Sequence, residues 1–340
     1  MRSLNKVHEN RLLSRWSESF TRHPDQIGGF QETDAELLPL DEKRVLAFTI
    51  DTVAEEVATG LYKDAQTAGR TAVLSSLSDL AAVGAEPLGL LIATTIPPDN
   101  FEAVQASLSV GINEAVNIAG VAVLGGDTNE GAALEVSCAA AGLVPRATVI
   151  SRMGAAPGNL LFVSGPIGLG GALAAAVLLG FDTFSENDYR PLPRLKEGQL
   201  IRRFASCCMD TSDGLIATLD QLARLNGVRF RLETGFSSVL HPLAQKLRSQ
   251  AGLPSFPFAA SYHGEFELVF TIDPALERDF LAEAAGIGWR PLQLGRIETG
   301  QGIGTPTGDI DGAWVRNLLQ ETRGDLLEYA RRLIAEGPQG

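Results

Sequence analysis

Strand-like and helix-like segments alternate twice along this chain of 340 residues, and this alternation restricts the fold more than any other feature. Apolar runs of strand length occur at 45–53, 88–96 and 134–144, while segments rich in alanine and serine at 68–83 and 101–120 have the composition of helices. Alternating elements of this kind build layers in which helices pack on sheets. We therefore predict an α/β fold in an α+β layered arrangement.

A polar stretch punctuated by glycine and proline, 146–158, divides the two series of elements. A chain of this length supports two domains of ordinary size. We predict an N-terminal helix within residues 1–27, an N-terminal domain at 28–148 and a C-terminal domain at 149–340. In the C-terminal domain the sequence predicts strands at 159–165 and 263–272, a strand continuing into a helix at 207–227, and one terminal helix at 312–336.

The charge and the apolar content exclude several classes of partner. A formal net charge of −13 argues against a nucleic-acid surface, because phosphate backbones require clustered Lys and Arg. The first residues are too charged for a signal peptide, and the most apolar stretch, 171–181, is too short to span a bilayer. The three cysteines form no CxxC motif, hence neither a disulfide framework nor a zinc site. We predict a cytoplasmic protein with no membrane partner.

Six aspartates lie in short motifs rich in Gly, Ser and Thr, at the ends of apolar strands or within the small-residue helix. They are Asp34 in ETDAELL, Asp51 in FTIDTV, Asp79 in LSDLAAVGA, Asp127 in LGGDTN, and Asp210 and Asp213 in MDTSDGL. Clustered carboxylates repel one another when partly desolvated and must be neutralised. Because Mg²⁺ takes oxygen ligands and usually shares carboxylates with substrate phosphates, these motifs favour a magnesium–polyphosphate site.

Several of these motifs also have a purely structural interpretation. In MDTSDGL, Ser212 or Asp213 can cap the helix that follows, and Asp127 can be a turn residue after a buried strand and two glycines. Asp79 favours function more clearly, because a carboxylate among apolar residues in mid-helix needs partners.

Two further motifs are candidates for binding. The glycine-rich turn SGPIGLGG at 164–171 follows a predicted strand and precedes a helix, where backbone N–H groups can hold a phosphate; a structural glycine turn explains it equally well. Glu265 and Glu267 lead the strand predicted at 263–272, and a spacing of two places them on one face. Glu265 is therefore a candidate substrate contact, with a solvated sheet face as the alternative.

In combination and in this order, the motifs LSDLAAVGAEP, GGDTN, RMGAAPGN and MDTSDGL are specific, and the chain resembles the thiamine-monophosphate kinase family. The wider superfamily contains aminoimidazole ribonucleotide synthetase, selenophosphate synthetase and a hydrogenase-maturation dehydratase. The resemblance extends over nearly the whole chain. It implies an aminoimidazole ribonucleotide synthetase-like fold, in which the N-terminal domain forms the sheet core of a homodimer and carries metal and ATP sites. A C-terminal α/β domain lies beside it.

The resemblance also implies ATP and Mg²⁺ as cofactors and assigns residues to them by position. The implied metal ligands are Asp34, Asp51, Asp79, Asp127, Asp210 and Asp213. The implied ATP contacts are Ser212, Arg152, Gly125, Gly126 and Asp127, and the residues expected to carry catalysis are Asp213, Asp210 and Arg152. Glu265 is expected near the acceptor, with His263 and Phe266 as further substrate contacts in the same motif.

The sequence departs from the family pattern mainly on the acceptor side. The Gly-Asp-Asp-Ala motif has Thr33 in place of its first aspartate, and Ile50 replaces a hydroxyl residue of the Ser-Thr-Asp-Thr motif. The acceptor-site histidine of the kinase falls on Ala58, and Gly-Gly-Glu-Asp-Tyr-Glu-Leu reads HGEFEL at 263–268. The absence of an N-terminal cysteine disfavours selenophosphate synthetase.

Our leading hypothesis is Mg-ATP-dependent phosphoryl transfer to a small molecule, a reaction that needs positioning and charge stabilisation rather than a protein nucleophile. The alternatives are ATP-dependent activation of an amide or carboxyl oxygen, as in the synthetase branch, and a non-catalytic nucleotide-binding scaffold. The metal motifs that remain argue for catalysis.

Overall fold

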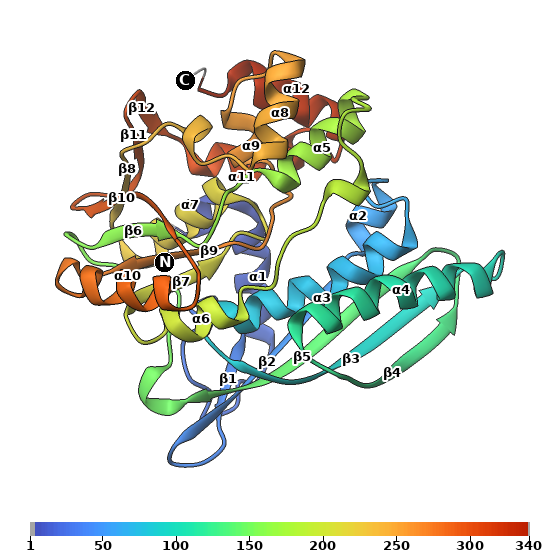
Figure 1. Cartoon of the computed structure of the whole chain (residues 1–340), viewed down its shortest axis with the longest axis horizontal. Helices are drawn as coiled ribbons and strands as arrows, with labels where there is room; N and C mark the ends of the chain where they lie inside the picture. The colour runs from blue at the N-terminus through green and yellow to red at the C-terminus, as the bar shows by residue number, and fades with distance from the viewer. Residues whose placement is uncertain (1–3, 339–340) are drawn as a thin grey trace.

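The strands of the computed structural model, which describes residues 4–338, form two separate sheets (Figure 1). The first sheet has the order β1-β2-β5-β3-β4, and the second has the order β12-β11-β8-β10-β6-β9-β7. The first is built from β1 (Glu36–Pro39), β2 (Arg44–Thr52), β3 (Glu86–Ile96), β4 (Val123–Glu130) and β5 (Glu135–Pro145). The second is built from β6 (Leu160–Val163), β7 (Ala205–Asp210), β8 (Arg229–Leu232), β9 (Leu268–Ile272), β10 (Leu292–Glu298), β11 (Gly302–Thr305) and β12 (Gly308–Ile310).

Helices surround these sheets. In the first half they are α1 (His8–Ser19), α2 (Ala54–Ala58), α3 (Ala65–Ala82) and α4 (Phe101–Ala119). In the second half they are α5 (Leu169–Leu179), α6 (Leu195–Ile201), α7 (Leu215–Asn226), α8 (Pro242–Ala251), α9 (Phe256–Ala260), α10 (Glu277–Gly286), α11 (Gly312–Glu321) and α12 (Leu326–Glu336). The predicted mixed α/β fold is confirmed.

Helices cover only one face of the first sheet. Figure 1 shows α3 and α4 side by side against it, and both contact its strands. Along β2, Val45 and Ala47 point to these helices and are fully buried, whereas Phe48 and Ile50 on the other face are 40% and 71% exposed. This is the period of two expected of a strand with one covered face. The uncovered face is apolar.

Helix α3 lies between the two sheets and joins them. It contacts β2, β3 and β5 of the first sheet, and β7 and β9 of the second. Its sequence, AQTAGRTAVLSSLSDLAA, has small side chains all round, and 14 of its 18 residues are buried. A helix buried on every side is expected to lack a polar face, and small residues allow backbones to approach closely. Helix α3 therefore positions any group it carries between both halves of the molecule.

Three elements differ from the sequence expectations. The strand predicted at 263–272 begins only at Leu268, because Phe266 has a φ of 63° and the chain turns there. The terminal helix is two helices, separated where Arg323 and Gly324 take φ values of 53° and 78°. Strand β4 is exposed along its whole length rather than buried, and Asp127 lies within it rather than after it.

The first sheet comprises strands from residues 36–145, and the second comprises strands from 160–310. The division at 148/149 that we proposed from the sequence falls in the connection between them. Among residues 4–338, no helix combines the length and apolar character needed to cross a membrane.

Candidate active site

Carboxylates from distant parts of the chain meet where α3 passes between the sheets. Asp79 lies near the end of α3, Asp51 near the end of β2, and Asp210 is the last residue of β7. Asp34 precedes β1. Carboxylate oxygens of Asp34, Asp79 and Asp210 all lie within 4.8 Å of one another. The order of elements thus brings together residues that are as far apart in sequence as 34 and 210.

Hydroxyl groups fix the orientation of these carboxylates. Ser78 Oγ donates to Asp210 Oδ2 at 2.6 Å, and Ser212 Oγ donates to Asp210 Oδ1 at 2.9 Å. Thr49 Oγ1 donates to Asp79 Oδ2. Ser212, an expected ATP contact, is therefore beside the carboxylate cluster and bound to one of its members. The hydroxyls supply hydrogen bonds but no positive charge.

Arg152 is the guanidinium of the cluster. Its Nη2 lies 2.7 Å from Asp34 Oδ1 and its Nε lies 3.1 Å from the same oxygen. The Asp34 side chain is 1% exposed, so the ion pair is largely removed from water. Asp34 has a second oxygen, Oδ2, which is buried without a hydrogen-bond partner. The Arg152 guanidinium therefore satisfies only one of the two carboxylate oxygens of Asp34.

The shared burial of these groups shifts their pKa values. Burial, together with the charge of Asp210, raises the pKa of Asp51 to about 6. Burial raises the pKa of Asp34 to about 6 in spite of Arg152, and it raises the pKa of Asp79 well above its usual range. Each shift means that the ionised cluster is unfavourable unless a cation accompanies it.

The donor set fits a hard divalent cation. Every ligand atom offered is oxygen, three carboxylates converge within 4.8 Å, and Oδ2 of both Asp34 and Asp51 is buried and unpartnered. Magnesium and calcium take oxygen ligands of this kind, whereas zinc and copper favour nitrogen or sulfur. The residues present therefore fit the implied Mg²⁺.

Asp213 lies one turn beyond this cluster, at the start of α7. The N-cap of α7 is Gly214, with no side-chain capping bond, so the structure gives no support to the capping interpretation of MDTSDGL. Burial, with Glu9 nearby, raises the pKa of Asp213 to about 7. Its side chain lines a cavity of about 530 Å³. The sequence motif thus places Asp210 in the carboxylate cluster and Asp213 on the wall of a cavity.

Asp127 is remote from the cluster within one chain. Asp127 lies on the edge strand β4, where it pairs with Ala93 of β3. Asp51 is on β2, three strands away from β4 in the order β2-β5-β3-β4. Neighbouring strands are about 4.8 Å apart, so the two backbones are separated by about 14 Å. Asp127 is exposed and accepts a bond of 2.7 Å from Asn129. Gly125 and Gly126 lie beside it, equally exposed.

The glycine-rich turn already binds a carboxyl group of the protein. Glu265 Oε2 accepts a 2.7 Å bond from the backbone N–H of Gly168, the N-cap of α5, and Thr211 Oγ1 donates to Glu265 Oε1 at 3.2 Å. A Cβ on Gly170 would lie 2.1 Å from the Gly264 carbonyl oxygen. The turn is therefore packed against residues 263–265, and the position at which a phosphate could bind is filled by the Glu265 carboxyl group. This favours the structural interpretation of its glycines.

The three residues predicted as substrate contacts are buried. Glu265 is 3% exposed, His263 is 4% exposed and Phe266 is 6% exposed. The His263 ring is 3.1 Å from the Tyr62 hydroxyl through Nε2 and packs on Tyr189 with centroids 5.0 Å apart. Burial lowers the pKa of His263 to about 4, so its imidazole is neutral. Burial also raises the pKa of Glu265 to about 8.

The expected sheet face shared by Glu265 and Glu267 does not form, because strand β9 starts after both residues. Glu267 instead pairs with Arg194 at 2.5 Å and accepts a bond from Ser164. Glu265, His263 and Phe266 are not among the residues that line the 530 Å³ cavity, and their role as acceptor contacts stays a prediction.

Residues without a motif line the cavity beside Asp213. It is bounded by α1, α7, α11 and the segment before β9, and its lining includes Leu12, Glu55, Tyr262, Val315, Arg316, Leu319 and Arg323. The sequence analysis did not single out any of these residues.

The comparisons with known proteins agree with this geometry. Residues 32–144 match the family model described as AIR synthase related protein, N-terminal domain. The thiamine-monophosphate kinase of Escherichia coli K12 is 31% identical over 287 residues, which cover 82% of this chain and 84% of that protein.

Two solved structures share the fold. The structure of thiamine-monophosphate kinase from Stenotrophomonas maltophilia K279a has a TM-score of 0.68 at 26% identity, covering 89% of this chain and 98% of that one. AaThiL complexed with AMPPCP and TMP has a TM-score of 0.73 at 22% identity, covering 90% of this chain and 96% of that one.

The two-sheet fold with a carboxylate cluster at α3 defines an AIR synthase-related protein. Within that class, the identity and coverage show that the chain belongs to the thiamine-monophosphate kinase family. The resemblance identified from the motifs is thus confirmed, as is the prediction of an ATP-dependent enzyme of this superfamily.

Proposed function

We propose that this protein catalyses Mg-ATP-dependent phosphoryl transfer to a small-molecule acceptor, with thiamine monophosphate as the first acceptor to test. The observation that carries the proposal is the convergence of Asp34, Asp79 and Asp210 within 4.8 Å, with Asp51 adjoining and Arg152 as their cation. Such a cluster has an unbalanced negative charge that bound metal and polyphosphate would complete. The naming of relatives as thiamine-monophosphate kinases, and of one structure as a complex with AMPPCP and TMP, supports the reaction type.

The chain's own residues would act by positioning. Asp34, Asp51, Asp79, Asp210 and Asp213 would hold Mg²⁺, which when bound neutralises charge on the polyphosphate oxygens. Ser78 and Ser212 keep the Asp210 carboxylate in one orientation through bonds of 2.6 and 2.9 Å. Arg152 would exchange part of its contact with Asp34 for a phosphate oxygen, which it can do because its side chain is 18% exposed.

The acceptor would occupy the cavity next to Asp213. Its volume of about 530 Å³ lies within the range of 300–1,000 Å³ that is usual for small-molecule sites. Asp213 belongs both to the wall of this cavity and to the motif that carries Asp210. An acceptor there would therefore have its reactive end beside the proposed metal and the transferred phosphoryl group.

We further propose a homodimer in which the partner copy completes the site. The uncovered face of the first sheet exposes Phe48, Ile50 and Leu91, at 40%, 71% and 52%, and apolar area of this kind is typical of an obligate interface. Strand β4 is an open edge of the same sheet. Association through this face would carry Asp127, with Gly125 and Gly126, toward the Asp51 side of the partner. It would thereby supply the sixth aspartate that one chain keeps about 14 Å away.

The experiment is calorimetry of AMPPCP binding with and without Mg²⁺, followed by an assay of ADP release with thiamine monophosphate and with a panel of other phosphate esters. Magnesium-dependent binding and acceptor-dependent ADP release are expected. Binding without release for every acceptor, including amides and carboxylates, would indicate a nucleotide-binding scaffold. Binding that is indifferent to Mg²⁺ would contradict the metal assignment.

A further inference from the structure

We propose that the N-terminal segment, residues 4–19, forms a specificity-determining wall of the acceptor cavity and that Arg316 positions it. The inference rests on the proposed function, because it takes the cavity beside Asp213 as the acceptor site. It goes beyond that function by assigning acceptor selection to elements outside residues 32–144, which match the family model.

The N-terminal segment contributes directly to the cavity. His8, Glu9 and Leu12 of α1 line it, opposite Val315 and Leu319 of α11. Leu12 is 47% exposed although it is apolar. A large apolar side chain at the wall of a cavity gains contacts when a ligand fills that space. Without α1, this side of the cavity would be open to solvent.

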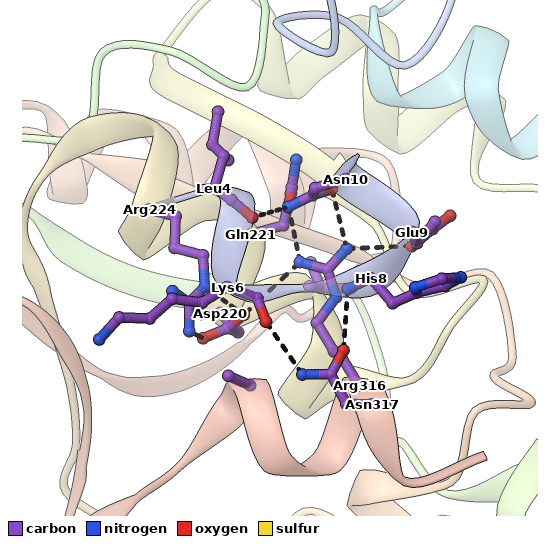
Figure 2. Close-up of polar contacts among 12 residues, drawn as sticks. Leu4, Lys6, His8, Glu9, Asn10, Asp220, Gln221, Arg224, Arg316 and Asn317 are labelled. Atoms are coloured by element: carbon purple, nitrogen blue, oxygen red, sulfur yellow. Dashed lines mark hydrogen bonds and ion pairs between the residues drawn. The ribbon is translucent and has the colours of Figure 1, made fainter. Parts of the chain in front are cut away.

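Arg316 of α11 is the centre of the contacts that hold the segment in place (Figure 2). Its Nη2 donates to Glu9 Oε2 at 3.1 Å and to Asn10 Oδ1 at 3.3 Å. Its Nη1 donates to Gln221 Oε1 at 2.6 Å and lies 3.5 Å from Asp220 Oδ2. The Arg316 side chain is 8% exposed, and its bonds to Asn10, Gln221 and Asp220 are shielded from water, whereas Glu9 is 55% exposed. These bonds tie α1 to both α7 and α11.

Two amides extend the clamp. Asn10 is 1% exposed and donates from Nδ2 to Gln221 Oε1 at 3.0 Å. Asn317 accepts from the His8 backbone N–H at 2.8 Å and donates to the Lys6 carbonyl at 3.0 Å. Figure 2 shows these groups converging on one end of α1. Because Asn10 is buried, losing Arg316 leaves its Oδ1 without this donor, whereas Asp220 keeps its bonds to Arg224.

The rest of α1 has little apolar anchoring. Trp16 and Phe20, which follow Leu12 at intervals of four, are 67% and 66% exposed. The position of α1 over the cavity therefore depends on its N-terminal end, where Val7 is fully buried and the polar clamp lies. Release of the clamp would free the wall without disturbing α3 or the carboxylate cluster.

The lining indicates which acceptors would fit. Leu12, Ala217, Val315 and Leu319 give the cavity an apolar body. Tyr262 also lines it, and its buried hydroxyl has no hydrogen-bond partner. Burial, with Glu55 and Glu56 nearby, raises the pKa of Tyr262 above its usual range. A ligand with an apolar organic body and one polar atom facing Tyr262 would satisfy this wall, with its phosphate end toward Asp213.

The test uses Arg316→Met, Leu12→Trp and a control, Arg332→Met. The control removes a half-buried arginine of α12, outside the cavity lining, that pairs with Glu336 of the same helix and with Glu321 of α11. We expect Arg316→Met to raise the KM for thiamine monophosphate at least tenfold, with AMPPCP affinity unchanged within twofold. Amide hydrogen exchange over residues 8–19 should become faster in Arg316→Met only. Leu12→Trp fills the cavity without breaking the clamp, so it should raise the acceptor KM while exchange stays at the wild-type rate.

The outcomes separate the two proposals. An active wild-type enzyme whose acceptor KM is unchanged in both Arg316→Met and Leu12→Trp would overturn the present inference and leave the proposed function intact. Unchanged exchange over 8–19 in Arg316→Met would overturn the clamp. If the wild-type protein releases no ADP with any acceptor, the proposed function is refuted, and the acceptor role of this cavity with it.

Discussion

At the scale of single residues, the unusual feature is that the protein concentrates carboxylates where it excludes water. Asp34, Asp51 and Asp79 each have a raised pKa because they share one buried region, and Arg152 neutralises only part of their charge. In the absence of a cation this arrangement opposes folding. The cluster is therefore an example of stability given up for binding.

Asp79→Asn tests directly whether the cluster lowers stability in favour of binding. Asparagine keeps an acceptor for the Thr49 hydroxyl but removes one negative charge from the cluster. We expect loss of Mg-dependent ATP turnover by at least about 100-fold, since placement of the metal carries most of the rate in such reactions. The metal-free variant should unfold at a temperature equal to or above that of the wild type, as measured by calorimetry. Asp99→Asn, on the surface, is the control and should change neither quantity.

The cluster also gives stability a particular pH dependence. The folded-state pKa values of Asp34 and Asp51 are about 6, above the value of about 3.9 expected in the unfolded chain. The folded state then binds protons more tightly, so these groups favour folding at low pH, and that contribution is lost as pH rises through about 6.

Metal-free protein should consequently lose melting temperature between pH 5 and pH 8. Added Mg²⁺ should restore more of it at pH 8 than at pH 5, because the ligands must be deprotonated. Thermal unfolding with EDTA or with Mg²⁺ measures this difference. An equal effect of Mg²⁺ at both pH values would mean that the metal binds elsewhere.

At the scale of elements, close packing around α3 determines where the carboxylates lie. Gly198 of α6 faces α3 so closely that a Cβ there would be 2.1 Å from the Ala81 carbonyl oxygen, two residues from Asp79. By contrast, a Cβ on Gly286, at the end of α10, would meet nothing within 4 Å. The two glycines differ in surroundings although each belongs to a helix.

Gly198→Ala should therefore destabilise the protein by about 1–3 kcal/mol through overpacking. Gly286→Ala should have an effect within about 0.5 kcal/mol, or stabilise, since alanine is the better helix former. Chemical denaturation measures both. If α3 shifts in Gly198→Ala, Mg-dependent AMPPCP binding should weaken as well; equal stabilities of the two variants would contradict the proposed tight contact.

The elements also show what the sequence can and cannot predict. Strand β2 and helices α3 and α4 follow from an apolar run and from helical composition, and MDTSDGL correctly located a strand end followed by a helix. The positive φ of Phe266 could not be predicted, because the alternation of Glu265, Phe266, Glu267 and Leu268 is typical of a strand. The role of Arg316 depends on contacts with residues 95 and 307 positions away in the sequence, which no local pattern records.

At the scale of the whole molecule, the arrangement of the six aspartates points to assembly. Five of them gather around or beside α3, while Asp127 lies on an exposed edge strand. Spacing along the chain could not distinguish a residue that joins the cluster within one copy from one that joins it across an interface. Our proposed homodimer makes that distinction testable.

Mixed dimers of Asp51→Asn and Asp127→Asn provide the test. Each variant alone should be inactive. In a heterodimer, one site would combine both changes and the other would have neither, so random mixing should restore about a quarter of wild-type activity, since about half the dimers are heterodimers with one intact site. Two Asp127→Asn copies with separate tags are the control. No restoration, with heterodimers present by mass spectrometry, would place Asp127 with its own chain's site or with none.

Ile50→Asp should convert the dimer to monomer in sedimentation.

Helix α3 has a further consequence for how this protein can vary. Nearly all of its surface belongs to one hydrophobic core or the other, so a substitution there must suit two sets of neighbours at the same time. In a deep mutational scan, α3 would tolerate the narrowest range of side chains of any helix in the chain, and compensating changes would arise in pairs, one in each half. The halves could not be exchanged between relatives unless α3 and its neighbours on both sides were exchanged together.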